Sequence, residues 1–209
     1  MKNEKVPIVD ARSRIEINML AEAELRRVQP TLLKKPGKID LGLFLEFGGI
    51  QKYGFEYAIS EFEAGVEGCT DLKGKLLILN ENVYNGANDG NARDIFTVFH
   101  EYGHVLLHRH LQKRMYEYGS SAVQRAYRRD IPAYINPEWQ ANELSAGMLM
   151  PLSHCMQIIE SGGNWIDFCE LFGVSTAAAQ VRERVVREIL DDPKKKAKAL
   201  VSLSHRDLF

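Results

Sequence analysis

The sequence contains little cysteine, no long apolar run and no surplus of either charge. Its cysteines, Cys69, Cys155 and Cys169, are odd in number and far apart, which suits neither a disulfide framework nor a cysteine-rich metal site. We interpret them as reduced thiols that mostly fill the interior. The 27 basic and 28 acidic side chains leave a net charge of −1, so no overall field draws the chain to nucleic acid or to an anionic membrane.

Membrane insertion and secretion are also disfavoured. No stretch approaches the roughly 18 consecutive apolar residues that a spanning helix needs. The first residues, MKNEKVPIVDARSRIEI, lack the apolar core of a signal peptide. We therefore expect a cytoplasmic protein with no membrane partner. Its 209 residues, of which 45% are apolar, are typical of a globular protein with one sizeable core.

Regular patterns before residue 95 predict a helix, a small sheet and a loop. Residues 10–28 show the helical spacing of apolar side chains, and Pro30 closes the segment. Residues 55–62 and 75–80 are β-compatible runs separated by glycines and by Thr70-Asp71, which predicts the strands of a small antiparallel sheet. The polar residues 81–94 are expected to form a loop that leads into a long helix.

Two stripes of side chains characterise this long helix. The apolar stripe recurs every three or four residues and is expected to face the core; it comprises Ile95, Phe99, Tyr102 and Leu106. The polar stripe comprises Thr97, His100, Glu101, His104 and His108. On a helix that is anchored in a core, such a polar stripe faces either water or a cleft.

Residues 100–104 fit the pattern H-E-x-x-H. In a helix, residues four apart differ by about 40° in direction and about 6 Å along the axis, so His100 and His104 can reach one ion. Glu101 then lies beside the metal and can accept a proton from bound water. Because this short pattern also occurs by chance on solvated helices, the test is a third ligand: catalytic zinc takes three protein ligands and keeps one position for water.

Neither of the later histidines suits that third position. In a continuous helix His108 lies about 12 Å along the axis from His100, too far to share an ion whose ligands lie near 2 Å. We expect it behind the ligands or on the surface. His110 stands at the last position of the longer pattern H-E-x-x-H-x-x-G-x-x-H, but this sequence has Leu107 where that pattern turns the chain at a glycine. The helix should therefore carry His110 away.

A second helix supplies two carboxylates. Asn136 as N-cap, Pro137 at the first helical position and Pro151 as terminator mark a helix that contains Glu138 and Glu143. Five residues apart, these two side chains point about 140° from each other, so one ion cannot easily be reached by both. The spacing alone leaves open which of them is the ligand.

The segment FTVFHEYGH, followed by EWQANELSAGMLMP, closely resembles the ImmA/IrrE family of metallopeptidases, whose pattern is roughly fTxxHExGH and then ExxANxFAxxLLMP. The resemblance implies that Glu138, the first acidic residue of the second motif, completes the metal site of His100 and His104. The other matches to the second motif are Ala141, Asn142, Met150 and Pro151, whereas Leu144 and Ser145 replace its usual Phe-Ala pair. The resemblance extends from about Lys75 to Pro151, and the first fifty residues are unmatched.

The resemblance implies an α+β fold with a zincin-like core of the gluzincin type. In such a core a small sheet packs on the HExxH helix, and a second helix carries Glu138. We expect an N-terminal helical segment (1–50), the metallopeptidase core (51–151) and a C-terminal helical segment (152–209). The last of these contains predicted helices at 153–159, 165–172 and 175–190, followed by a polar, frayed tail at 191–200.

The implied function is that of a zinc-dependent endopeptidase in which Glu101 is the general base. Its implied substrate is a DNA-binding, helix-turn-helix repressor of a mobile element or a stress response. Candidate donors to the oxyanion are Tyr134, Tyr118 and His154. The strand at 75–80 is a candidate edge for binding an extended peptide, with an internal strand as the alternative. The basic segment 109–129 is a candidate lid over an acidic or flexible target.

Three alternatives stay open at this stage. Residues 165–186 resemble a helix-turn-helix, and Arg182, Arg184 and Arg187 of its second helix could enter a major groove of DNA. We favour the interpretation that this segment braces the catalytic helices, because residues 151–209 hold eight basic and eight acidic side chains, and a DNA-binding segment should be more basic.

The protein could also sequester a repressor or toxin without cleaving it. The ligand types do not separate zinc from manganese.

Overall fold

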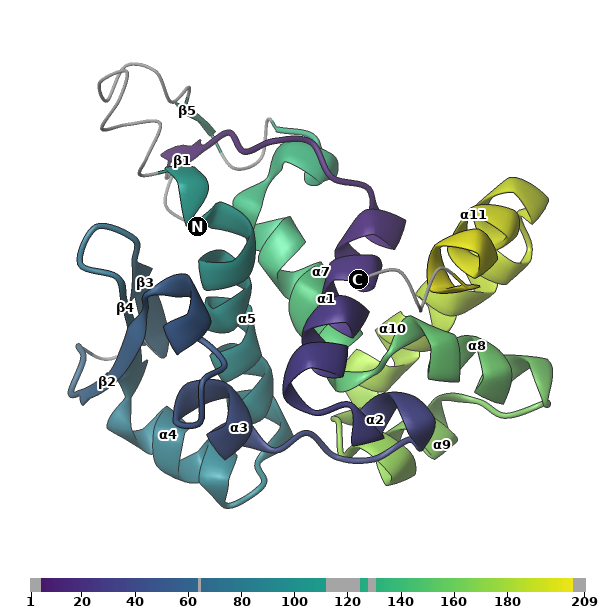
Figure 1. The fold of residues 1–209 in the computed structure, drawn as a ribbon, viewed down its shortest axis with the longest axis horizontal. Coiled ribbons are helices and arrows are strands. Elements are labelled where there is room, and N and C mark those ends of the chain that lie inside the picture. The colour runs from purple at the N-terminus through teal and green to yellow at the C-terminus, as the bar shows by residue number, and fades with distance from the viewer. Residues whose placement is uncertain (1–4, 64, 112–124, 128–130, 205–209) are drawn as a thin grey trace. The chain divides into compact units, whose positions relative to one another are not determined.

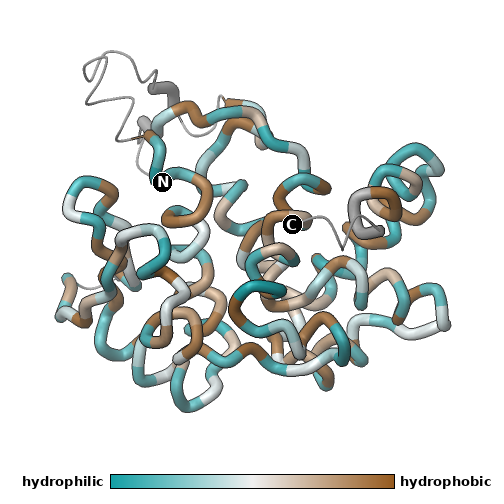
Figure 2. Tube along the Cα trace, viewed as in Figure 1, coloured by the Kyte–Doolittle hydropathy of each residue, from teal (hydrophilic) through white to brown (hydrophobic). Residues whose placement is uncertain are grey.

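The structure, a computed structural model, describes residues 5–63, 65–111, 125–127 and 131–204 (Figure 1). It confirms the predicted α+β class, since helices predominate, three strands form a small sheet and two others pair with each other. Cys69, Cys155 and Cys169 are free thiols, and Cys155 is buried. Within the described ranges, no helix combines the length and the apolar character that crossing a membrane requires. Figure 2 illustrates this, because polar and apolar residues are mixed along the helices.

The elements follow one another along the chain as labelled in Figure 1. The N-terminal half contains β1 (Lys5–Pro7), α1 (Arg14–Val28), α2 (Thr31–Lys34), α3 (Leu41–Leu45), η1 (Gln51–Tyr53), β2 (Glu56–Ser60), β3 (Gly68–Asp71), β4 (Leu76–Asn80), α4 (Glu81–Asn88) and α5 (Ala92–His108). The C-terminal half contains β5 (Arg125–Tyr127), η4 (Ala133–Ile135), α7 (Pro137–Leu149), α8 (Leu152–Glu160), α9 (Trp165–Phe172), α10 (Thr176–Leu190) and α11 (Pro193–Ser204).

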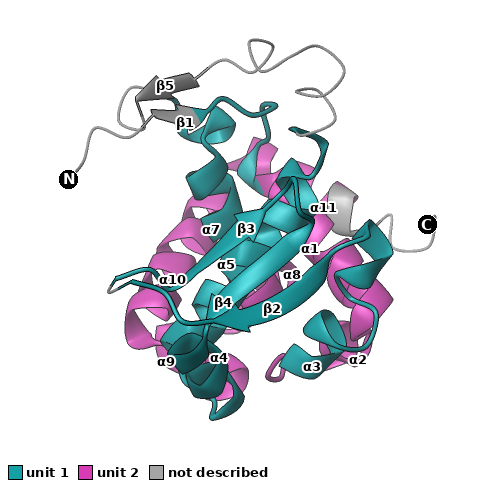
Figure 3. Ribbon diagram, turned by 90° about the vertical axis from the view of Figure 1, so that its left-hand side faces the viewer, with its two compact units in different colours: residues 1–14, 41–145 teal, residues 15–40, 146–209 magenta. Residues whose placement is uncertain are grey.

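The chain forms two compact units, each assembled from segments that are distant in the sequence (Figure 3). Unit 1 comprises residues 1–14 and 41–145, and unit 2 comprises residues 15–40 and 146–209. This division groups residues by spatial contact. The three consecutive segments expected from the sequence, 1–50, 51–151 and 152–209, stay a prediction. All the residues of the candidate site belong to unit 1.

The sheet of unit 1 has the strand order β2-β4-β3 (Figure 3). β4 pairs in parallel with β2 and antiparallel with β3, so the predicted antiparallel sheet is mixed instead. The prediction of residues 75–80 as an edge is also wrong, because β4 is the central strand. Leu77 and Leu79 are fully buried, and the apolar run around them is typical of a strand covered by its neighbours. The edges of this sheet are β2 and β3.

Helix α4 occupies most of the segment that the sequence predicted as a loop. The side chain of Asn80 accepts a hydrogen bond from the backbone N–H of Asn82 and begins the helix. Val83 and Ala87, one turn apart, are its buried side chains. Two apolar residues among polar neighbours are a weak signal in the sequence, and the helix is stabilised by packing against α5 and the sheet.

Helix α5 packs against β3 and β4 and carries the histidine motif. The side chain of Asn91 caps it by accepting hydrogen bonds from the backbone N–H groups of Arg93 and Asp94. Two members of the predicted apolar stripe, Phe99 and Tyr102, face the core, whereas Ile95 and Leu106 are half-buried. Phe99 and Tyr102 are fully buried, and both rings meet the Phe44 ring edge-on, with centroids 5.2 Å and 5.6 Å away.

Unit 2 contains the three helices predicted after Pro151, namely α8, α9 and α10. Gly173 ends α9 with a positive φ of 68°, and Ser175 caps α10 by accepting from the N–H of Ala178. The prediction of a frayed tail at 191–200 is wrong for residues 193–200, because α11 spans Pro193–Ser204. The Asp192 side chain accepts from the N–H groups at the start of this helix, and Ala199 is fully buried.

Arg182 of α10 is buried, although the helix-turn-helix hypothesis required it to be exposed. Its side chain is 2% exposed, and Nη2 donates to Asn18 Oδ1 at 2.7 Å and to the Met150 carbonyl at 2.6 Å. Arg187 is exposed but pairs with Glu183 at 2.6 Å. Arg182 therefore joins α10 to α1 and to the turn after α7, and its buried position excludes the contact with DNA bases that the hypothesis assigned to it.

Candidate metal centre

Helix α5 and residues 137–145 of α7, all of unit 1, bring the candidate ligands together. The side chain of Asn136 accepts a hydrogen bond from the N–H of Glu138 at 3.0 Å, which confirms the predicted N-cap of α7. Gly103 allows the two backbones to approach closely, because a Cβ atom there would lie 3.0 Å from the Cα atom of Ala141. His104 follows Gly103 directly, and Glu138 lies one turn before Ala141. The close approach therefore places these two side chains opposite each other.

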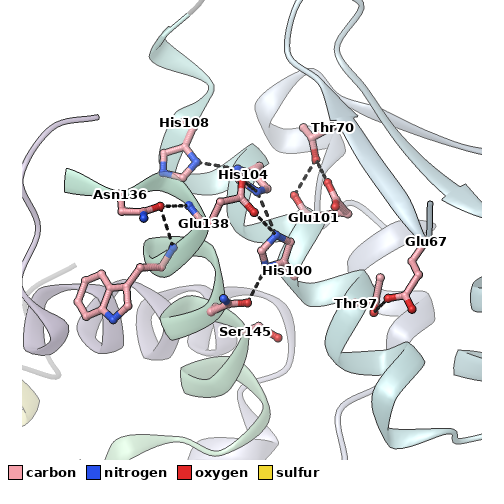
Figure 4. Close-up of polar contacts among 12 residues, drawn as sticks. Glu67, Thr70, Thr97, His100, Glu101, His104, His108, Asn136, Glu138 and Ser145 are labelled. Carbon is pink, nitrogen blue, oxygen red and sulfur yellow. Dashed lines mark hydrogen bonds and ion pairs between the residues drawn. The ribbon is translucent and has the colours of Figure 1, made fainter. Parts of the chain in front are cut away.

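His100, His104 and Glu138 converge on one point (Figure 4). The two Nε2 atoms are 3.2 Å apart; Nε2 of His100 lies 3.5 Å from Glu138 Oε2, and Nε2 of His104 lies 3.6 Å from Oε1. Ligand atoms bound at about 2.0–2.1 Å around a tetrahedral ion are separated by about 3.3–3.4 Å. The three distances fit three ligands of one zinc-sized ion.

Asn142 orients the ring of His100. Its Oδ1 lies 2.8 Å from Nδ1 of the imidazole. Because an amide oxygen only accepts, Nδ1 donates the proton, and Nε2 presents its lone pair to the point of convergence. Histidines that bind metals typically donate their other ring N–H to an oxygen in this way.

His108 stands behind His104, on the side away from the point of convergence. Its Nδ1 lies 2.9 Å from His104 Nδ1, and its Nε2 lies 3.2 Å from Gln140 Oε1. The side chain is buried, and both ring nitrogens are engaged. Among the described residues, His108 is not one of the converging donors, in agreement with the helix geometry.

The electrostatics of the site favour a cation. The pKa of His100 is raised: burial acts to lower it, but the hydrogen bond with Glu138 and the charge of Glu101 together outweigh burial. Burial and the neighbouring His108 and His100 lower the pKa of His104 to about 3, and burial lowers that of His108 to about 4. The low pKa values keep His104 and His108 neutral, so His104 offers a lone pair. The carboxylates of Glu138 and Glu101 supply negative charge beside His100, and together these groups form a suitable donor set for a divalent ion.

Strand β3 holds the carboxylate of Glu101. The Thr70 hydroxyl lies 2.7 Å from Oε2 and 3.0 Å from the carbonyl oxygen of Glu101 (Figure 4). Gly68, on the same face of β3, leaves room for this side chain, because a Cβ atom there would lie 3.2 Å from Glu101 Cγ. Burial of Glu101 raises its pKa, and the Thr70 hydroxyl and His100 oppose that shift. Only 8% of the residue is exposed.

The other carboxylate of α7 has a different partner. Oε1 of Glu143 lies 3.0 Å from Nε of Arg14. The guanidinium of Arg14 also packs over the Trp139 ring, with Cζ 5.7 Å from the ring centroid. Glu138 and Glu143 thus point to different sides of the helix, as their spacing predicts. His110 is exposed and is not one of the converging donors among the described residues.

The structure assigns no role to the candidate oxyanion donors or to the candidate lid. Tyr134 is half exposed, and its backbone carbonyl accepts from Gln140. His154 belongs to unit 2, where its Nε2 donates to the carbonyl of Leu32 at 2.8 Å. Tyr118 and most of the segment 109–129 lie outside the described residues, apart from β5, which pairs antiparallel with β1. The oxyanion and lid roles stay predictions.

Sequence reasoning missed two residues that contact the site. Thr70 was interpreted as part of a turn, and nothing in the sequence marks a hydroxyl group that meets Glu101 from 31 residues away. Gln140 lies inside the second motif, two residues after Glu138, at a position where the motif specifies no residue. Only the folded chain shows that it meets His108.

Comparison with known proteins identifies a family whose model covers the residues of the candidate site. None of the curated proteins that were compared with the chain matches it. The model of the Peptidase M78 family, described as the IrrE N-terminal-like domain, matches residues 70–183. This range is more than half of the chain and begins at the strand that holds Glu101. It includes α5, α7 and the turn that leads into α10. The chain therefore belongs to the Peptidase M78 family, the peptidases with an IrrE N-terminal-like domain.

Proposed function

We propose that the protein is a metal-dependent endopeptidase whose ion is held by His100, His104 and Glu138 and whose general base is Glu101. The observation that carries this proposal is the convergence of the three donor atoms at distances of 3.2–3.6 Å, with a buried carboxylate supported beside them. Membership of a peptidase family supports hydrolysis of a peptide bond as the reaction.

The donor set supports zinc as the ion. Two imidazole nitrogens and one carboxylate form the ligand set of several catalytic zinc sites, with a fourth position left for water. Manganese prefers more oxygen ligands and a higher coordination number, so it is the second choice. Asn142 and His108, which meet the outer nitrogens of the two imidazoles, support both rings in the orientation that ligation needs.

The bound ion, Glu101 and Thr70 have different roles in the proposed reaction. A bound zinc ion would supply Lewis acidity to the scissile carbonyl and acidity to the attacking water. Glu101 accepts the proton of that water and passes it to the leaving amine, and Thr70 keeps the carboxylate facing the reacting atoms. Since Glu101 is almost fully buried, little bulk water competes for this proton.

Strand β3 is our candidate for binding the backbone of the substrate. It is an edge strand of the sheet, and its residue Thr70 touches Glu101. An extended peptide that adds to such an edge forms main-chain hydrogen bonds and depends little on its side chains. The scissile bond would then lie near Glu101. This assignment replaces the strand at 75–80, which is the centre of the sheet.

We propose as substrate a DNA-binding repressor, of the helix-turn-helix type, that controls a mobile element or a stress response. This part of the proposal is supported by the resemblance of the two motifs to the ImmA/IrrE family. An edge strand that recognises backbone rather than side chains suits cleavage in an extended, flexible segment of such a protein.

Incubation with candidate repressors tests the function directly. The full-length protein loaded with zinc is expected to produce two fragments at one site, detected by mass spectrometry. Removing the ion with a chelator should stop cleavage, because the Lewis acid and the activated water are lost together, and adding zinc should restore it. Cleavage that continues at the same rate in the metal-free protein would contradict the proposal.

Substituting Thr70 tests the support of the general base. Thr70→Val keeps the shape and β-propensity of the residue but removes the hydroxyl, so we expect kcat to fall by roughly tenfold or more, since a hydrogen bond to a charged group contributes about 1.5–3 kcal/mol. Zinc stoichiometry and KM should be unchanged. Thr70→Ser, which retains the hydroxyl, is the control and should keep most of the activity. Equal rates for the Val and Ser variants would contradict the role of Thr70.

A further inference from the structure

A chain of hydrogen bonds leads from His104 into the interior of unit 1. His104 Nδ1 lies 2.9 Å from His108 Nδ1, and His108 Nε2 lies 3.2 Å from Gln140 Oε1. The amide nitrogen of Gln140 lies 2.9 Å from the carbonyl oxygen of Asp10 and 2.8 Å from that of Tyr134. Gln140 is fully buried and His108 is 2% exposed. The contact between His108 and Gln140 is therefore shielded from solvent, and the other contacts of the chain are partly buried.

The direction of every hydrogen bond in this chain follows from its inner end. Backbone carbonyls only accept, so the Gln140 atom that faces Asp10 and Tyr134 must be the NH₂ group, and the atom that faces His108 must be the oxygen. Because that oxygen accepts, His108 Nε2 carries the proton. A neutral imidazole has one N–H, so His108 Nδ1 is an acceptor and His104 Nδ1 donates to it.

The proton on His104 Nδ1 decides which nitrogen of His104 can bind a metal. A proton on Nδ1 leaves the lone pair of His104 on Nε2, the atom that lies 3.6 Å from Glu138 Oε1 and 3.2 Å from His100 Nε2. We propose that His108 and Gln140 are positioning residues that hold His104 in this tautomer and ring orientation, so that its lone pair is ready for the metal before the metal arrives. This inference rests on the proposed metal site and extends it to two residues outside the ligand set.

Gln140 also ties the metal site to two other segments. Its two carbonyl partners belong to the stretch after β1 and to η4, which are joined by backbone hydrogen bonds from Val9 to Ile135 and from Arg12 to Tyr134. Since α7 carries both Gln140 and Glu138, the same helix supplies one ligand and the anchor that orients another. Loss of the anchor should therefore weaken metal binding without removing a ligand.

The tautomers can be read directly in the full-length wild-type protein. The chain contains six histidines, and the two-bond ¹⁵N–¹H correlations of ¹⁵N-labelled imidazoles distinguish an Nε2–H ring from an Nδ1–H ring. We expect the Nε2–H form for His108 and the Nδ1–H form for His104, with resonances assigned by substitution. The Nδ1–H form of His108 would overturn the proposal. This measurement needs neither zinc nor a substrate, so it decides the tautomers even if the proposed function fails.

Zinc affinity gives the second readout, measured by competition with a chelating dye. His108→Leu is expected to weaken zinc binding about 10- to 100-fold, the usual cost of losing a partner behind a metal ligand, while stoichiometry stays at one ion. His108→Asn, whose Oδ1 can take the place of Nδ1, should recover part of the affinity. Gln140→Met should weaken binding in the same direction. If His108→Leu binds as tightly as the wild type, the proposal is wrong.

The controls separate this inference from the metal site itself. His104→Ala removes a proposed ligand and should abolish tight binding. If wild type and His104→Ala bind zinc equally, the metal site is wrong; if only His104→Ala differs from wild type, the positioning role is wrong. Should His108→Leu fail to fold, as judged by circular dichroism, Gln140→Met and the wild-type tautomers decide the question.

Discussion

Glu101→Gln is expected to lower the rate of peptide cleavage by about 10²- to 10⁴-fold, the usual contribution of a positioned general acid–base. The amide has nearly the size and shape of the carboxylate, and the Thr70 hydroxyl, 2.7 Å from Oε2, can still donate to the amide oxygen. The side chain therefore keeps its place but cannot accept the proton of the attacking water. Because Glu101 is not one of the three converging donors, zinc affinity should change by only a few-fold.

Cleavage is measured by mass spectrometry on the repressor found by the incubations, and zinc content by elemental analysis. Glu67→Gln is a matched control. Glu67 contacts Arg93 and Thr97, which precede the motif on α5, and it is not a candidate ligand or base. The same change of charge should therefore leave the rate of cleavage nearly unaffected. A Glu101→Gln variant that cleaves at the wild-type rate would remove Glu101 from the mechanism.

The same variant separates catalysis from sequestration. A regulator that only binds its repressor or toxin needs the surface around the site and not the proton transfer, so Glu101→Gln would preserve its effect. A peptidase loses its effect but keeps its affinity for the substrate. Binding of the repressor to Glu101→Gln without cleavage, together with loss of regulation in cells, is the result that we expect. Full regulation by the variant would favour sequestration.

The elements that carry the site could be predicted because their signals are local. Asn91 and Asn136 cap α5 and α7, and helical spacing within each element places His100 beside His104 and turns Glu143 away from Glu138. All of these relations depend on residues within a few positions of one another. Glu138 itself was assigned through the resemblance of the motif, since spacing alone allowed either carboxylate.

Relations between distant segments could not be predicted in the same way. The order of the strands depends on which neighbours cover β4, and the short runs at 56–60 and 76–80 show no difference between a parallel and an antiparallel pairing. The contact of Thr70 with Glu101 and that of Gln140 with His108 arise only when β3 and α7 pack on α5. Arg182 illustrates the same limit, because a basic residue on a polar helix is usually exposed, and here it is buried by contacts with Asn18 and Met150.

Glu138→Ala is expected to weaken zinc binding by at least about 100-fold and to abolish cleavage at ordinary zinc concentrations. Loss of a partner behind a ligand already costs about 10- to 100-fold, and this substitution removes a ligand. It also removes a negative charge that lies beside both imidazoles, whose Nε2 atoms are 3.5 Å and 3.6 Å from its oxygens. Two neutral nitrogens then have to hold a divalent ion without a bound anion.

Glu143→Ala provides the comparison within the same helix. It removes an identical carboxylate five residues away, whose partner is Arg14 at 3.0 Å, so zinc affinity should stay within a few-fold of the wild type. Both variants are measured by dye competition on the full-length protein, with folding checked by circular dichroism. The proposed coordination requires a large loss for Glu138→Ala alone. Equal affinities for the two variants would mean that the carboxylate of α7 does not complete the site, because two carboxylates that point about 140° apart cannot replace each other around one ion.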